Sequence, residues 1–311
     1  MALSLTRRVV TDDDVELAVF VGGNPQGPTV VMVHGWPDTH LMWLPVAERL
    51  ASRCRVVLYD TRGQGESVPP GESHGPVSFA LPELARDFFA VIDDVSPDQP
   101  VHVLAHDWGS IQVWEAVCEP GAEQRVASFV TMSGPNLDHL AMWVRRTLRR
   151  PTLRGITQVA TQAMSSSYVP FFVSPLAGPV LRRVATRARW RQLLTATEGS
   201  EPAPDTHAAT LVQDMVNGLG YYRANALTVG GRPRQRRTVV PVLQLVLTKD
   251  RAVRPDSLSE SERWVQRLEQ VELPYGHWAA LTHPEAVAEQ TEWFIGSVVP
   301  LGVDGPGDHH E

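Results

Sequence analysis

The sequence lacks several features that mark specialised classes of protein. Its 311 residues include only two cysteines, Cys54 and Cys118, so we expect neither a disulfide framework nor a cysteine-based zinc site. No run of 18 or more apolar residues is present, which argues against a membrane-spanning helix. The first twenty residues carry acids where a signal peptide needs its apolar region. We therefore expect a cytoplasmic protein.

Composition and charge narrow the choice further. Hydrophobic residues make up 43% and charged residues 20% of the chain, which is ordinary for a globular protein. A formal net charge of −7 argues against nucleic acid as the main partner. The charge is unevenly spread, because residues 137–237 hold 15 arginines, no lysine and five acidic residues. A basic segment is thus set into an acidic body.

Strand-like and helix-like stretches alternate over the first 135 residues. Runs of β-branched residues indicate buried strands, and apolar residues at helical spacing indicate helices. The predicted strands are 15–21, 28–35, 54–60, 100–107 and 125–134, and the predicted helices are 79–95 and 108–119. This alternation predicts a parallel sheet with right-handed crossovers and helices on both faces.

The pattern changes at residue 136. Helix-like, arginine-rich sequence broken by prolines continues to about residue 238. The strand signal returns at Val239, followed by a last strand near Val271 and a helix over 284–296. We therefore predict an α/β fold formed by residues 1–135 and 239–298, with a helical insertion at 136–238. Residues 299–311 have the composition of a disordered tail.

A strand-to-helix junction at residues 105–109 has the features of a nucleophile elbow. Small residues, Ala105 and Gly109, stand two before and two after Asp107, as a tight turn that presents its central side chain requires. A carboxylate can attack carbon and form an ester without first losing a proton. The pentapeptide alone equally allows an ordinary aspartate that caps the helix beginning at Trp108.

Other residues fit the same chemistry by their order along the chain. The turn at residues 34–37 follows a strand, so the backbone N–H of Trp36 could complete an oxyanion hole with that of Trp108. The alternative is an ordinary turn without a catalytic role, whose shape is set by Pro37. Asp250 ends a strand, and His277 lies on a loop after the last strand. Nucleophile, acid and base then follow the order found in α/β-hydrolases.

These motifs resemble the α/β-hydrolases of the branch that contains epoxide hydrolases and haloalkane dehalogenases. The segments HGWPD, DTRGQGES, HDWGS and GHW match that branch at successive positions over nearly the whole chain. The resemblance implies that the insertion is the cap domain of this branch. It implies a cap-bearing epoxide hydrolase of bacterial type, and a cis peptide bond between Trp36 and Pro37.

The cap should decide between the two chemistries of the branch. Epoxide hydrolases resemble one another in two cap tyrosines that hold the epoxide oxygen, and this chain has only five tyrosines. The resemblance assigns the second of these roles to Tyr222, with Tyr221 as the substitute if the register is off by one. Tyr168 lies where the first is expected. For each, the alternative is a ring packed in the cap whose hydroxyl bonds locally.

The implied reaction is hydrolysis of a lipophilic epoxide to a vicinal diol, with no metal or organic cofactor. Asp107 forms an alkyl ester, and His277, oriented by Asp250, activates the water that hydrolyses it. The residues expected to contact the substrate are Trp36, Trp108, Phe171 and Phe172.

Two other functions remain open at this point. A haloalkane dehalogenase would use the same aspartate, with Trp108 and either Trp143 or Trp190 as halide donors. Some dehalogenases carry the acid after the sixth strand, and in this chain that position would make Asp138, rather than Asp250, the acid. A ligand-binding receptor built on the hydrolase fold is the alternative that is not an enzyme.

The basic insertion also raises the question of a peripheral membrane contact. Residues 140–150, LAMWVRRTLRR, mix apolar side chains with four arginines, as in helices that lie in a membrane interface. The stronger interpretation is a solvated arginine face whose apolar stripe packs on the core. The oligomeric state does not follow from the sequence.

Overall fold

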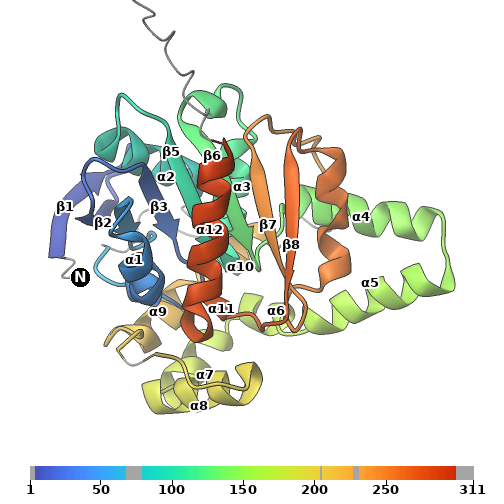
Figure 1. Ribbon diagram of the computed structural model, residues 1–311. Coiled ribbons are helices and arrows are strands. Elements are labelled where there is room, and N and C mark those ends of the chain that lie inside the picture. The colour runs from blue at the N-terminus through green and yellow to red at the C-terminus, as the bar shows by residue number, and fades with distance from the viewer. Residues whose placement is uncertain (1–3, 68–78, 204, 227–230, 299–311) are drawn as a thin grey trace, which may run out of the picture.

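The computed structural model describes residues 4–67, 79–203, 205–226 and 231–298 (Figure 1). The predicted disordered tail lies outside these ranges. The body is an eight-stranded sheet in the order β1-β2-β4-β3-β5-β6-β7-β8. Neighbours from β4 to β8 are parallel, whereas β2 runs antiparallel to both β1 and β4. This confirms the predicted α/β fold with a mostly parallel sheet.

All the strands predicted from the sequence are present. The strands are β1 Ser4–Val10, β2 Glu16–Gly23, β3 Thr29–Val33, β4 Arg55–Tyr59, β5 Val101–His106, β6 Val126–Met132, β7 Val242–Leu247 and β8 Leu268–Leu273. Only β1 was not predicted. It pairs with β2 alone, at the edge of the sheet, and its sequence, SLTRRVV, has no continuous apolar run.

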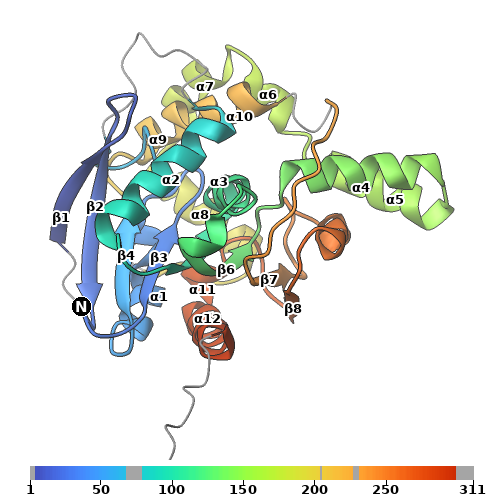
Figure 2. The ribbon, with the colours of Figure 1, turned by 90° about the horizontal axis from the view of Figure 1, so that it is seen from above.

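Helices cover both faces of the sheet, as predicted. The helices outside the insertion are α1 Leu44–Leu50, α2 Leu81–Val95, α3 Asp107–Val117, α11 Ala279–Thr282 and α12 Pro284–Val298, with short 3-10 helices η1 His40–Trp43, η3 Ala122–Gln124 and η4 Pro255–Arg263. Figure 2 shows α2 and α3 on one face of the sheet and α1 and α12 on the other.

The central strand β3 explains why the buried strands read as continuous apolar runs. Val30 and Met32 pack toward α1 and α12, whereas Val31 and Val33 pack toward α2 and α3. All four side chains are fully buried. A strand covered on both faces gains from an apolar side chain at every position, and two hydrophobic cores form, one on each face.

Residues 136–238, called here the inserted segment, connect β6 to β7. Their described part is helical and contains no named strand: α4 Leu137–Arg149, α5 Leu153–Ser165, α6 Val169–Val173, α7 Ala177–Val184, α8 Arg187–Glu198, α9 Leu211–Asn217 and α10 Leu219–Asn225. Figure 1 places α6, α7 and α8 below the sheet and the α4–α5 pair beside it. Within the described ranges, no helix is long and apolar enough to cross a bilayer.

Helix α4 contains the stretch 140–150 that the sequence offered as a membrane-contacting helix. Its apolar residues turn inward: Trp143 is 3% exposed, and Leu140 and Val144 line an internal cavity. Leu148 is the apolar side chain of this stretch that is clearly exposed. For α4 the interpretation as a solvated arginine face with a packed apolar stripe is therefore the correct one.

Candidate active site

The elbow at residues 105–109 joins β5 directly to α3. Asp107 has a φ of +50°, the left-handed conformation that a turn this tight imposes on its central residue. A Cβ atom on Gly109 would lie 2.4 Å from the carbonyl oxygens of Val33 and His34, so no side chain fits there. Asp107 is 9% exposed and lies at the start of α3, where a helix N-terminus favours negative charge.

Two backbone N–H groups point at the Asp107 carboxylate. The Trp36 N–H donates to Oδ2 at 2.9 Å, and the Trp108 N–H also bonds the carboxylate. Burial raises the pKa of Asp107, although the nearby His277 and these two N–H groups oppose that shift. The Trp36–Pro37 peptide bond is cis, as the resemblance predicts. The two N–H groups lie where an oxyanion formed at this carboxyl group would need donors.

The imidazole of His277 lies between two aspartates. Its Nδ1 is 3.0 Å and 3.1 Å from the two oxygens of Asp250, and its Nε2 is 3.8 Å from Oδ1 of Asp107. Asp250 also accepts hydrogen bonds from the Ser133 hydroxyl at 2.8 Å and the Ala252 N–H at 2.7 Å. Burial would lower the pKa of His277, but the Asp250 carboxylate outweighs it and holds that pKa at about 9.

Asp138, the alternative acid, is engaged elsewhere. Its Oδ1 accepts the backbone N–H of Arg234 at 2.8 Å, and its Oδ2 accepts the guanidinium Nε at 3.0 Å. It lies at the start of α4, whereas Asp250 makes the contact with His277. The geometry therefore corrects the alternative in favour of Asp250.

The two candidate tyrosines meet above the elbow. Tyr168 lies just before α6 and Tyr222 lies on α10, with ring centroids 6.0 Å apart. Both line the same cavities as Asp107. Burial, together with the charge of Asp107, raises the pKa of the Tyr222 phenol above its usual value. The pKa of the Tyr168 phenol shifts the same way for the same reasons, although 37% of Tyr168 remains exposed at the mouth of the cavity. Both hydroxyls therefore stay protonated at neutral pH and can donate hydrogen bonds.

Tyr221 points away from this pair. Its hydroxyl donates to the carbonyl oxygen of Arg62 at 2.9 Å and meets the Thr61 hydroxyl at 2.8 Å. Tyr221 thereby fixes α10 against the glycine-rich turn at residues 61–67. Of the two neighbouring tyrosines, it is therefore Tyr222 that faces the cavity.

Two cavities meet at the elbow. The first, of about 510 Å³, runs between α7, α8 and the Trp36 turn, and the second, of about 380 Å³, runs between α4 and α5. The residues that line both are Asp107, Tyr168, Tyr222 and Ala252. Within the described ranges, no three His, Cys, Asp or Glu side chains are grouped as metal ligands. The carboxylate thus lies at the junction of two largely apolar arms.

The expected substrate contacts are only partly brought together. Trp36, Phe172 and Trp108 line one or other cavity. Phe171 lines neither and is 39% exposed, so the structure does not bring it to the cavity with the others. Consecutive residues of a helix point roughly 100° apart, and on the short helix α6 only one of the two phenylalanines can face the cavity.

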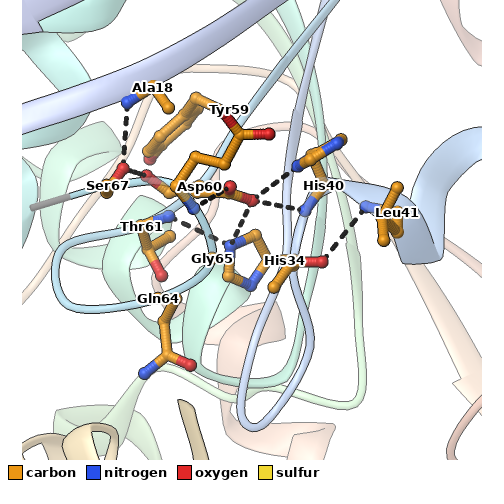
Figure 3. Close-up of polar contacts among 12 residues, drawn as sticks. Ala18, His34, His40, Leu41, Tyr59, Asp60, Thr61, Gln64, Gly65 and Ser67 are labelled. Atoms are coloured by element: carbon orange, nitrogen blue, oxygen red, sulfur yellow. Dashed lines mark hydrogen bonds and ion pairs between the residues drawn. The ribbon is translucent and has the colours of Figure 1, made fainter. Parts of the chain in front are cut away.

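A polar network behind the site fixes the turn that carries Trp36 (Figure 3). Asp60 accepts hydrogen bonds from both the backbone N–H and the Nδ1 of His40, at 2.7 Å and 2.8 Å. His34 accepts the Thr61 N–H through Nε2 at 3.0 Å. The two turns are thereby joined, which holds the Trp36 N–H in place beneath the cavity.

Sequence reasoning missed two acidic residues near His277. Glu198, at the end of α8, accepts the Trp278 N–H at 3.2 Å. Asp38 accepts the Trp278 indole N–H at 3.0 Å, and burial raises its pKa to about 7. Asp38 belongs to the HGWPD motif and could have been singled out, whereas nothing in the sequence around Glu198 indicates that the inserted segment reaches the histidine loop.

Known proteins resemble the chain in sequence. The family model for the α/β hydrolase fold matches residues 28–284. The "Probable oxidoreductase EphD" of Mycobacterium tuberculosis is 41% identical over 292 residues, covering 91% of this chain and 48% of that protein. "Epoxide hydrolase A" of the same organism is 32% identical over 133 residues, covering 42% of this chain and 39% of that protein. The chain therefore spans about half the length of the first of these relatives.

Solved structures show the same fold. An epoxide hydrolase from Bacillus megaterium superposes with a TM-score of 0.76 at 18% identity, covering 93% of this chain and 100% of the other. Epoxide hydrolase VrEH1 from Vigna radiata superposes with a TM-score of 0.70 at 21% identity, covering 94% and 97%. At such identities the likeness speaks for the fold alone.

Proposed function

Because the chain belongs to the α/β-hydrolase fold family, we propose that it is an epoxide hydrolase whose inserted segment acts as a cap over the site. The observation that carries this proposal is the pair of tyrosines, Tyr168 and Tyr222, that faces Asp107 across a shared cavity. The relatives named as epoxide hydrolases support it. The substrate is a lipophilic epoxide and the product a vicinal diol.

In the first step Asp107 attacks one epoxide carbon. The carbon–oxygen bond of the ring breaks, and the negative charge that leaves the carboxylate develops on the epoxide oxygen. Tyr168 and Tyr222 donate hydrogen bonds to that oxygen and supply its proton. Positioned acids of this kind accelerate such steps by roughly 10²- to 10⁴-fold. The result is a hydroxyalkyl ester on Asp107.

In the second step water hydrolyses the ester. In the free protein the charge of Asp107 adds to that of Asp250 in keeping His277 protonated. Esterification removes the charge of Asp107, so the pKa of His277 falls and the neutral imidazole becomes available as a base. It takes a proton from the attacking water, while the N–H groups of Trp36 and Trp108 receive the oxyanion. Removal of one such donor lowers kcat by on the order of 10²- to 10³-fold.

When the carbonyl re-forms, the ester C–O bond breaks and the imidazolium gives its proton to the departing diol oxygen. Asp107 is left as a carboxylate, because its remaining acid proton returns to the tyrosine that protonated the epoxide oxygen.

Haloalkane dehalogenation is the alternative that uses the same aspartate. It requires indole N–H donors for a halide, and the candidates are Trp108 with either Trp143 or Trp190. The Trp36 indole N–H donates to the Met215 carbonyl at 3.0 Å, and that of Trp108 bonds the Tyr222 hydroxyl. Trp190 lines the first cavity, and its indole nitrogen has no partner among the described residues. Trp143 lines neither arm of the cavity, so Trp190 alone among the three candidates keeps an indole N–H for a halide. Two phenols, in contrast, face Asp107, and this favours a departing oxygen over a departing halide.

A matched substrate panel tests the proposal. We expect diol formation from 1,2-epoxyalkanes and no halide release from 1-chloroalkanes and 1-bromoalkanes of the same chain length. Asp107→Asn should abolish diol formation. Halide release without diol formation would make the protein a dehalogenase, and binding without turnover of either series would favour the receptor alternative.

A further inference from the structure

Helix α5 buries polar or small residues and exposes its large apolar ones. Its buried residues are Gly155 and Gln162, and Gln162 is held inward by the Ala252 carbonyl at 2.9 Å and the Arg254 N–H at 2.8 Å. Its large apolar residues point outward: Leu153 is 85%, Ile156 47% and Met164 76% exposed. Their spacing puts them on one face of the helix. An apolar stripe turned to solvent contributes nothing to the packing of the fold and is available to a partner.

A second exposed stripe lies on and just before α7. Leu176, Val180 and Val184 recur every four residues and are exposed by 66%, 41% and 45%. The buried residues of this helix are the small Ala177 and Gly178, and Leu181 is partly buried against the core. The three residues of the stripe are left largely to solvent.

Arginines accompany both stripes. Arg149, Arg150 and Arg154 are exposed around the α4–α5 turn, and Arg182 and Arg183 on α7. Among the described residues, no carboxylate pairs with any of these five. Together with the arginine excess over residues 137–237, this makes the surface cationic as well as apolar. We call it the arginine–apolar surface, comprising Leu153, Ile156, Met164, Leu176, Val180, Val184 and these five arginines.

The arginine–apolar surface adjoins both arms of the cavity. Val184 is exposed and also lines the first arm. On α5, Val159 and Ala163 line the second arm, and Ala163 is also exposed. Figures 1 and 2 show α5 running from the outer end of the α4–α5 pair back toward α6. A lipophilic molecule that reaches either stripe is therefore next to a cavity wall.

We propose that the arginine–apolar surface docks on a lipid bilayer that contains anionic lipid. Exposed apolar residues flanked by arginines are the combination that binds such an interface, through buried apolar area and attraction to anionic headgroups. The charge favours this occupant over a second copy of the chain, since two such surfaces repel each other. The inference goes beyond the proposed function, because docking requires no turnover.

Vesicle co-sedimentation tests the proposal on the full chain. We expect recovery with vesicles of phosphatidylcholine and phosphatidylglycerol, weaker recovery with phosphatidylcholine alone, and a decrease with added salt. Leu153→Gln/Met164→Gln should weaken binding at least tenfold. Arg149→Gln/Arg150→Gln/Arg154→Gln should weaken it by about fivefold per charge on anionic vesicles only. None of these side chains lines either arm of the cavity, so turnover of a short, water-soluble epoxide should be unchanged.

The control is Trp293→Gln, which removes an exposed aromatic residue from α12, outside the inserted segment. It should bind vesicles like the wild type. Equal recovery with neutral and anionic vesicles, or wild-type binding by the α5 variant, would overturn the proposal. The proposal would also be overturned if the wild type bound no vesicles and light scattering showed it to be a dimer that the α5 variant dissociates. If vesicles bind but no epoxide is turned over, docking stands and the proposed function fails.

Discussion

At the scale of single residues, the candidate site consists of three side chains that the parallel sheet brings to one edge. Asp107, Asp250 and His277 come from three different strand ends, and parallel strands bring such ends to one edge of the sheet. The structure places them together, with His277 between the two carboxylates. Side chains of the inserted segment complete the surroundings of the site: Glu198 accepts a hydrogen bond from the histidine loop, whereas Phe171 lies outside both arms of the cavity.

The neighbouring tyrosines Tyr221 and Tyr222 provide a matched test of the proposed chemistry. Tyr168→Phe and Tyr222→Phe each remove one donor to the epoxide oxygen, so each should slow ester formation by roughly 10-fold or more. The double variant should lose most activity, and the losses should be non-additive because both groups act on one oxygen. Burst kinetics on an epoxide should show that ester hydrolysis is much less affected.

Tyr221→Phe is the control for this pair. Its hydroxyl bonds Arg62 and Thr61 rather than facing the cavity, so its loss should lower stability by about 1 kcal/mol and leave ester formation intact. Wild-type epoxide opening by the Tyr168→Phe/Tyr222→Phe double variant would remove the main support for an epoxide hydrolase and favour a dehalogenase.

At the scale of elements, periodicity predicted each central strand of the sheet. For the inserted segment it predicted helix but neither the bounds of the individual helices nor the faces that they expose. Strands such as β3 and β5 are buried on both faces, so their apolar runs are unambiguous. β1 was not predicted, because an edge strand needs fewer apolar residues and its sequence shows no apolar run. For α4 the stronger interpretation from the sequence was a packed apolar stripe, and α4 does pack its apolar face over the second arm of the cavity. The sequence analysis did not single out α5, where the exposed apolar stripe lies.

The two arms predict a preference for epoxides within a chain over epoxides at its end. With Asp107 at the junction, an internal epoxide can place one alkyl chain in each arm. Ala163→Trp should obstruct the second arm, and should lower kcat/KM for an internal epoxide by about tenfold with a smaller effect on a terminal epoxide of equal carbon number.

Ala160→Trp is the matched control, since Ala160 is exposed on the same helix and lines neither arm. It should leave both substrates unaffected. If Ala163→Trp slows both substrates equally, the second arm does not hold substrate.

At the scale of the whole molecule, buried histidines should make the fold sensitive to acid. Burial lowers the pKa of four of them to about 4 or about 3: His34, His102, His106 and His139. In the unfolded chain each would titrate near 6.5. Between these values the unfolded state binds more protons, so the stability present above pH 6.5 is lost as the pH falls toward 4. Asp38 and Asp214, whose pKa values burial raises to about 7 and about 6, offset part of that loss.

His102 allows this prediction to be checked away from the site. It lies on β5 and bonds the Ser128 hydroxyl at 2.8 Å. His102→Gln should reduce the fall in unfolding free energy between pH 6.5 and 4 by about 1.4 kcal/mol per pH unit, measured by urea titration at several pH values. An unchanged slope would show that His102 is not a source of the acid sensitivity.

The central claim is that Asp107 is alkylated by an epoxide and that His277 releases the ester. The most direct measurement is the intact mass of His277→Gln after exposure to an epoxide, with Asp107→Asn as the control. We predict a gain of one substrate mass in His277→Gln, mapped to the peptide that contains Asp107, and no gain in Asp107→Asn. If neither variant gains mass while the wild type turns over the same epoxide, the covalent mechanism is contradicted.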